Sequence, residues 1–123
     1  MEVQGITWHA VTLDAESFAA QAKLLKKTMG LTAVERPGFA LFRFPHGDIL
    51  ELYPPESVPA YGFNDGGMAF GFRVDDIEAA SRELEAAGCE MLSDIKRLPE
   101  TGYAYRHFRG PDGRVYGLNE SRS

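Results

Sequence analysis

The chain has 123 residues, a length that suits one domain with its own hydrophobic core. Its 13 lysines and arginines against 18 aspartates and glutamates give a formal net charge of −5, without a basic run, which argues against nucleic acid as a partner. The single cysteine, Cys89, excludes an internal disulfide, and no apolar run approaches the roughly 20 residues of a membrane span. We therefore expect a cytoplasmic protein that has no membrane partner.

The first half of the chain predicts the order β-α-β-β-β. Residues 6–13 are rich in β-branched and aromatic types, which predicts a strand. Residues 17–29 change to a helical period, and Gly30 follows as a helix stop. The apolar positions of this helix are Phe18, Ala22, Leu25 and Met29. Short strands follow between turns that contain proline and glycine, at residues 32–35, 39–44 and 48–53.

The second half predicts the same order again. Residues 68–74 form a strand, and Asp75 with Glu78 has the spacing of a capping box that opens a helix. Gly88 is the predicted stop of this helix. Its predicted buried stripe consists of Ile77, Ala80, Leu84 and Ala87. The strands that follow are predicted at residues 90–92, 103–108 and 114–118.

The two halves therefore form an internal repeat within a single domain, residues 1–123. Module one covers about residues 5–54 and module two about residues 67–120, with a proline- and glycine-rich crossing between them. A duplication of this length predicts two cupped sheets that complete each other around a shared interior.

Glu51 is the residue that most needs an explanation. It interrupts an apolar strand, where alternation places it on one face with Ile49 and Tyr53 while Leu50 and Leu52 take the other. A carboxylate in a half-buried strand is costly unless a cation or hydrogen bonds compensate it. The alternative is an edge-strand glutamate that faces water.

The order and spacing of several short motifs resemble the glyoxalase/bleomycin-resistance/extradiol-dioxygenase superfamily, also called vicinal oxygen chelate. The motifs are Met29-Gly30-Leu31, Leu50-Glu51-Leu52-Tyr53, the segment from Phe72 to Glu78, and the segment from Phe108 to Gly113. The resemblance implies an α+β fold of two βαβββ modules that form an open, eight-stranded, barrel-like cavity with the helices outside. It also implies a homodimer, since members usually cover their open sheet edges with a partner chain.

Members of this superfamily that use a metal hold it with one ligand from the first and last strand of each module. The resemblance places these slots at Ala10, Glu51, Ala69 and Gly117. Only Glu51 has a donor side chain, and one carboxylate cannot hold a divalent metal against water. We therefore predict no metal cofactor. The alternative is a divalent metal held by Glu51 with His9, which requires a β-bulge to turn His9 to the Glu51 face.

The small residues at the emptied slots predict space beside Glu51 for a small, partly aromatic organic ligand. The predicted ligand-binding residues are Trp8, Ala10, Thr12, Glu51, Tyr53, Ala69, Arg73, Tyr103, Tyr105, His107 and Gly117. Arg73 is either an ion partner of Glu51 or a ligand clamp, and the aromatic residues can equally be ordinary core and surface side chains. The predicted function is binding without metal, as in relatives of the bleomycin-resistance type. The alternative is a lyase, isomerase or dioxygenase in which Glu51 is the catalytic base or a metal ligand.

Overall fold

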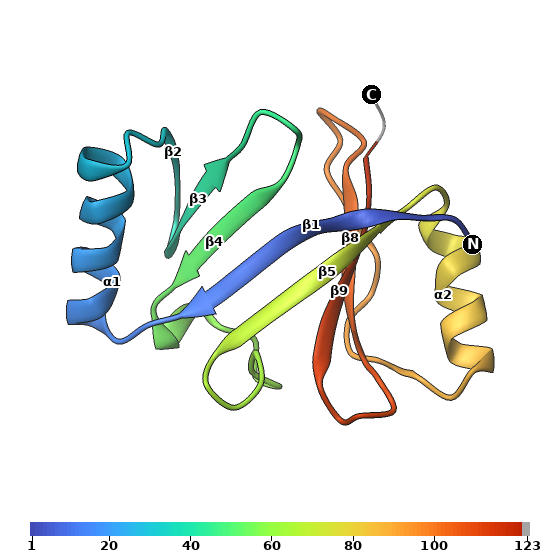
Figure 1. Ribbon diagram of the computed structural model, residues 1–123. Helices are drawn as coiled ribbons and strands as arrows, with labels where there is room; N and C mark the ends of the chain where they lie inside the picture. Colours follow the sequence, from blue (N-terminus) through green and yellow to red (C-terminus); the bar gives the residue numbers. More distant parts are fainter. Residues whose placement is uncertain (122–123) are drawn as a thin grey trace. The chain divides into compact units, whose positions relative to one another are not determined.

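The computed structural model describes residues 1–121, and these contain two α-helices and nine strands (Figure 1). The first half holds β1 (Val3–Thr12), α1 (Ala15–Lys23), η1 (Leu24–Thr28), β2 (Ala33–Arg36), β3 (Phe39–Arg43), β4 (Ile49–Tyr53) and η2 (Pro55–Ser57). The second half holds β5 (Met68–Val74), α2 (Ile77–Ala86), β6 (Glu90–Met91), β7 (Lys96–Arg97), β8 (Ala104–Arg109) and β9 (Val115–Glu120). None of the described helices has the length and apolar composition required to cross a membrane.

The strands are hydrogen-bonded in the order β2-β3-β4-β1-β5-β9-β8-β6, and β7 pairs with β8. The predicted mixed α+β class is confirmed. The predicted count of eight strands is wrong, because the two-residue β7 carries only charged side chains and shows no apolar alternation. The hydrogen-bonded path does not return from β6 to β2 among residues 1–121, so the strands do not close into a barrel, and the predicted open, barrel-like cavity stays a prediction.

The chain divides into two compact units. Unit 1 contains Met1–Trp8 and the chain from Phe70 onward, and unit 2 contains His9–Ala69. Strands β1 and β5 pass from one unit into the other. Each unit has a hydrophobic core of its own.

In unit 2 the core lies between α1 and one face of the strands. Helix α1 is capped at its N-terminus by Asp14, whose carboxylate accepts a hydrogen bond from the Ser17 amide at 2.7 Å. The core residues are Ala22, Leu25, Ala40, Phe42 and Leu52, with Val11, Leu13 and Leu50 among those packed against them. Alternation therefore points the residues between them to the opposite face.

In unit 1 the core lies between α2 and the sheet. Helix α2 is capped by Asp76, whose carboxylate accepts from the Ala79 amide, and not by Asp75 as the capping-box spacing predicts. The Asp75 carboxylate instead accepts from the backbone amide of Glu2, at 3.0 Å. The core residues are Val74, Ile77, Ala80, Ala104, Phe108 and Leu118.

Candidate functional site

Glu51 lies in β4 on the face that points away from α1. Its neighbours Leu50 and Leu52 both pack in the α1 core, and Glu51 itself is only 8% exposed. The Tyr53 hydroxyl donates a hydrogen bond to Glu51 Oε1 at 2.9 Å. The carboxylate therefore accepts at least one hydrogen bond from a neutral donor of its own strand.

The Tyr53 ring that supports Glu51 is itself fixed by aromatic packing. It stacks on Phe39 with a centroid separation of 4.9 Å and meets Phe63 edge-on at 5.3 Å. Aromatic pairs in these geometries contribute beyond the area that they bury, so the hydroxyl is held in position.

Ala10 and Thr12 share the Glu51 face by alternation, since Val11 and Leu13 pack on the α1 side. Ala10 and Ala69 are buried. Thr12 Oγ1 is buried without a hydrogen-bond partner among the described residues. The structure thus brings together, within unit 2, the predicted residues of β1 and β4.

His9 does not join Glu51. It follows the alternation of Val11 and Leu13, and its Nδ1 lies 3.1 Å from the Ile49 carbonyl oxygen of the neighbouring strand. The β-bulge that would turn His9 to the Glu51 face is therefore not seen in this part of the chain.

In unit 1 four predicted residues form a continuous aromatic row. The rings of Trp8 and His107 stack at 5.1 Å, and the row continues through Tyr105 at 6.3 Å from His107 to Tyr103 at 6.1 Å from Tyr105. Burial lowers the pKa of His107 to about 4, so the imidazole is neutral at pH 7.

Gly117 lies against this row, and the volume beside it is filled. A Cβ at Gly117 would be 2.6 Å from Trp8 Cε3, so the indole covers the face that the sequence predicts to be open. His107 is the register partner of Gly117 between β8 and β9. We call the face of the unit 1 sheet that carries the Gly117 and His107 side-chain positions the Gly117 face.

Two further polar residues lie on the Gly117 face. Arg73 of β5 and Asn119 of β9 are register partners, two positions beyond the partners Gly71 and Gly117. The sequence prediction includes Arg73 but misses Asn119. The signal was present, since Asn119 follows Gly117 at the strand period of two.

The donor set at the superfamily's metal slots does not fit a metal centre. Ala10, Ala69 and Gly117 offer no ligand atom, and Glu51 alone cannot complete a coordination shell. A second acidic group, Asp76, Glu78 and Glu120, has its carboxylates within 4.8 Å of one another. Arg97 already bonds two of them, to Glu78 at 2.9 Å and to Glu120 at 3.0 Å, which explains the cluster as a structural ion network.

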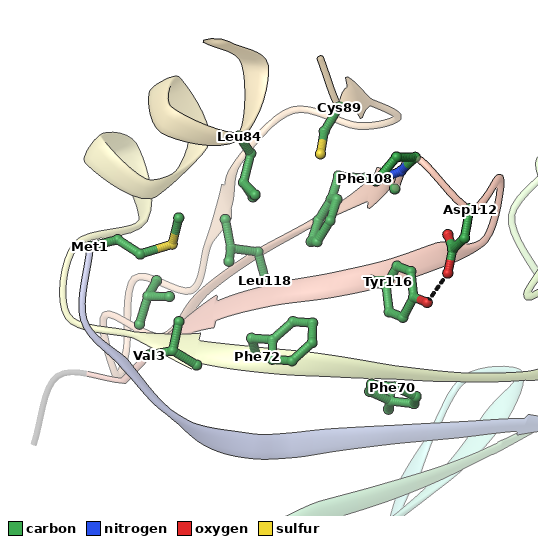
Figure 2. A pocket seen from close by; sticks show the side chains of 13 residues that line it. Met1, Val3, Phe70, Phe72, Leu84, Cys89, Phe108, Asp112, Tyr116 and Leu118 are labelled. Carbon is green, nitrogen blue, oxygen red and sulfur yellow. Dashed lines mark hydrogen bonds between the residues drawn. The ribbon is translucent and has the colours of Figure 1, made fainter. Parts of the chain in front are cut away.

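A groove of about 510 Å³ lies on the other side of unit 1, between α2 and the sheet, and contains none of the predicted site residues. Figure 2 shows Phe70, Phe72 and Tyr116 along the strands, with Leu84 and Cys89 above them. At one end the Tyr116 hydroxyl donates to the Asp112 carboxylate. This hydrogen bond lowers the pKa of Asp112 and raises that of Tyr116.

Several solved structures share the fold. A superfamily member from Vibrio splendidus 12B01 matches with a TM-score of 0.65 at 15% identity, covering 98% of this chain and 100% of that one. Methylmalonyl-CoA epimerase from Mycobacterium tuberculosis matches with 0.68 at 20% identity, covering 98% and 90%. The Streptomyces coelicolor epimerase, solved with 2-nitronate-propionyl-CoA, matches with 0.69 at 16% identity, covering 99% and 100%.

At these identities the structural matches show a common fold only. No functionally curated protein matches the sequence. A family model described as Glyoxalase/Bleomycin resistance protein/Dioxygenase superfamily matches residues 9–115, which is most of the chain. The protein therefore belongs to the glyoxalase/bleomycin-resistance/dioxygenase superfamily.

Proposed function

We propose that the protein binds a small, partly aromatic organic compound without a metal, and that Glu51 accepts a hydrogen bond from it. One observation carries this proposal: a buried carboxylate, bonded by Tyr53, lies on the sheet face opposite α1. A ligand with a donor or cationic group would form a charge-assisted hydrogen bond to this carboxylate, which is stronger than a neutral one. We also propose that the protein is located in the cytoplasm and forms a homodimer.

The test compares wild type with Glu51→Gln and with the control Glu56→Gln, which makes the same charge change at an exposed position. Thermal-shift measurements with aromatic amines and with quinone-like and glycopeptide compounds should show stabilisation of wild type. Glu51→Gln should weaken binding by roughly 1.5–3 kcal/mol, the contribution of a charged hydrogen bond, and Glu56→Gln should not. If Glu51→Gln unfolds many degrees earlier and its ligand response is unchanged, Glu51 is structural.

A metal-free site also predicts the metal content of the purified protein, which can be measured. Protein purified under mild conditions should contain less than a stoichiometric amount of zinc, iron, manganese or nickel by elemental analysis. One equivalent that survives dialysis and is lost in Glu51→Gln would contradict the binding proposal and favour a metalloenzyme.

The second candidate is an isomerase in which Glu51 is the general base. The epimerases among the structural matches favour it at the level of fold, and a carboxylate in a buried setting suits proton abstraction next to a carbonyl. Incubation with methylmalonyl-CoA in deuterated water tests it directly. Exchange of the C2 proton by wild type but not by Glu51→Gln would establish the enzyme, and no exchange by wild type would remove this substrate.

A further inference from the structure

We infer that unit 1 binds the oxyanion end of a small aromatic carboxylate through two buried donor atoms, Arg73 Nε and Asn119 Nδ2. The inference goes beyond the proposed function, because these residues belong to the other unit from Glu51. The ligand group also differs: Glu51 would bind a hydrogen-bond donor, whereas Arg73 and Asn119 would bind an acceptor.

Both donors lack an acceptor in the part of the chain that the structure describes. Arg73 Nε and Asn119 Nδ2 are buried and make no hydrogen bond within residues 1–121. Buried donors in native proteins are nearly always paired, so each of these atoms requires an acceptor that the described residues do not supply. Asn119 is only 2% exposed, so its Nδ2 atom is well shielded from bulk water.

The two donors are neighbours that face the same way. Arg73 and Asn119 are register partners in the parallel pair β5–β9, and register partners present their side chains on one face of a sheet. The Thr7 hydroxyl donates to Asn119 Oδ1 at 3.1 Å, which leaves Nδ2 as the available end of the amide. One acceptor group can thus satisfy both residues.

The charge of the pair selects an oxyanion rather than a neutral carbonyl. Arg73 carries a cationic guanidinium group, and a charge-assisted hydrogen bond to it is stronger than a neutral one. His107 on the same face is neutral at pH 7, because burial lowers its pKa to about 4. Arg73, and not His107, therefore supplies positive charge here.

The aromatic side chains of the Gly117 face favour a ligand with an aromatic ring. Tyr105 is the register partner of Asn119 on its other side, in β8. Tyr105 belongs to the row of rings that runs from Tyr103 to Trp8, on which a flat ring can stack. A carboxylate at the donors and a ring against Tyr105 describe an aromatic acid.

The experiment uses the fluorescence of Trp8, which is the only tryptophan of the chain. The full chain is titrated at pH 7 with benzoate, benzyl alcohol and cyclohexanecarboxylate. Benzoate should change the fluorescence saturably. Benzyl alcohol, which lacks the anion, should bind at least about tenfold more weakly, and cyclohexanecarboxylate, which lacks the flat ring, should also bind more weakly than benzoate.

Proton–nitrogen correlation spectra of the same titration provide an atomic readout on wild type. Bound benzoate should shift the Arg73 Nε–H and Asn119 Nδ2–H₂ signals, which are assigned by their loss in Arg73→Lys and Asn119→Leu. If these signals stay in place while benzoate is added to its solubility limit, the donors hold water only and the inference is overturned.

Arg73→Gln and Asn119→Leu should each weaken benzoate binding at least about tenfold. Arg82→Gln removes the same charge at an exposed position of α2 and should leave the affinity unchanged. Equal binding of benzoate and benzyl alcohol, or unchanged affinity in Arg73→Gln, would refute the inference. Because Arg73 is only partly buried, that variant decides the matter even if Asn119→Leu fails to fold.

Discussion

His107 is held in its neutral form by the residues around it, and this links stability to pH. Its pKa is about 4 in the folded chain against an ordinary value of 6.5. As the pH falls from 6.5 towards 4, the unfolded chain takes up a proton that the folded chain does not, so the free energy of unfolding decreases. Below the folded pKa this loss reaches roughly 3 kcal/mol.

Urea unfolding at several pH values between 7 and 4 checks this expectation. Wild type should lose more stability over this range than His107→Gln, since the variant lacks the titrating group. Parallel pH profiles for the two proteins would mean that His107 does not carry the effect.

Gly71 and Gly117 pack so closely that neither position has room for a methyl group. A Cβ on Gly71 would be 2.8 Å from Gly117 Cα, and a Cβ on Gly117 would be 2.6 Å from Trp8 Cε3. We expect Gly71→Ala and Gly117→Ala to destabilise by roughly 1–3 kcal/mol in urea unfolding. Gly71→Ala should cost more, because its neighbour is backbone and cannot rotate away.

Gly117→Ala has a control within the chain. In a Trp8→Phe background the smaller ring should reduce the cost of Gly117→Ala, which a double-mutant cycle measures. A cost that is the same in both backgrounds would show that the indole is not the obstacle.

At single residues, strand alternation predicted which face a side chain takes but not what covers it. Leu50 and Leu52 lie on the face opposite Glu51, as predicted, and the structure shows that this face packs against α1. The Trp8 ring over Gly117 could not be predicted, because it depends on a rotamer and on two residues that are far apart in the sequence. The sequence-based prediction of open space at Gly117 therefore failed at the level of packing.

At the scale of an element, the helical period of residues 17–29 predicts the first helix correctly but predicts the burial of its last apolar residue wrongly. The four-residue step from Leu25 predicts a buried Met29, yet Met29 is exposed. The reason is η1, where Leu24–Thr28 form a wider π-helical turn. In such a turn a residue four positions on no longer returns to the same face.

The start of α2 shows the same limit. Asp75 and Asp76 are both good caps by composition, so the spacing to Glu78 alone could not choose between them. Tertiary contacts decide, because Asp75 accepts from Glu2 while Glu78 pairs with Arg97. Neither partner is local in sequence.

Arg97 of β7 connects three elements of unit 1. It bonds Glu120 at the end of β9 and Glu78 in α2, and Glu120 also accepts from the Ile77 amide. The Glu120 side chain is 6% exposed and that of Glu78 is 47% exposed. Removing the cation would therefore leave a buried carboxylate without its ion partner.

We expect Arg97→Gln to lower the urea midpoint clearly, since the buried Glu120 carboxylate loses the cation that pairs with it. Glu78→Gln should change stability by about 1 kcal/mol or less, because exposed ion pairs contribute little. Equal effects of the two variants would mean that the bond to Glu120 contributes no more than the exposed one.

For the whole molecule, the order of the elements could be predicted because each has a local pattern of its own. All eight predicted strands and both helices are present. Strand β7 could not be predicted, because its two residues are held by pairing with β8 and by the Arg97 contacts rather than by a sequence pattern. Closure of the sheet depends on pairings between distant strands, which local periods do not determine.

The terminal strands β2 and β6 each have one neighbour in the sheet order, which leaves open edges among the described strands. Open edges promote pairing with a further chain, and we predict a homodimer. Sedimentation equilibrium at about ten micromolar, a concentration at which a stable interface persists, should give twice the 13.6 kDa of one chain. A species of 13.6 kDa at that concentration would contradict the prediction.

The position of Cys89 has a consequence for measuring motion. This half-buried thiol is the only one in the chain, lies three positions beyond the last residue of α2 and lines the groove beneath that helix. An increase in its rate of reaction with a maleimide above the rate in the folded chain therefore reports separation of α2 from the sheet. If that rate rises at urea concentrations too low to unfold the chain globally, then α2 opens as a separate cooperative unit, with a free energy of its own below that of the whole protein.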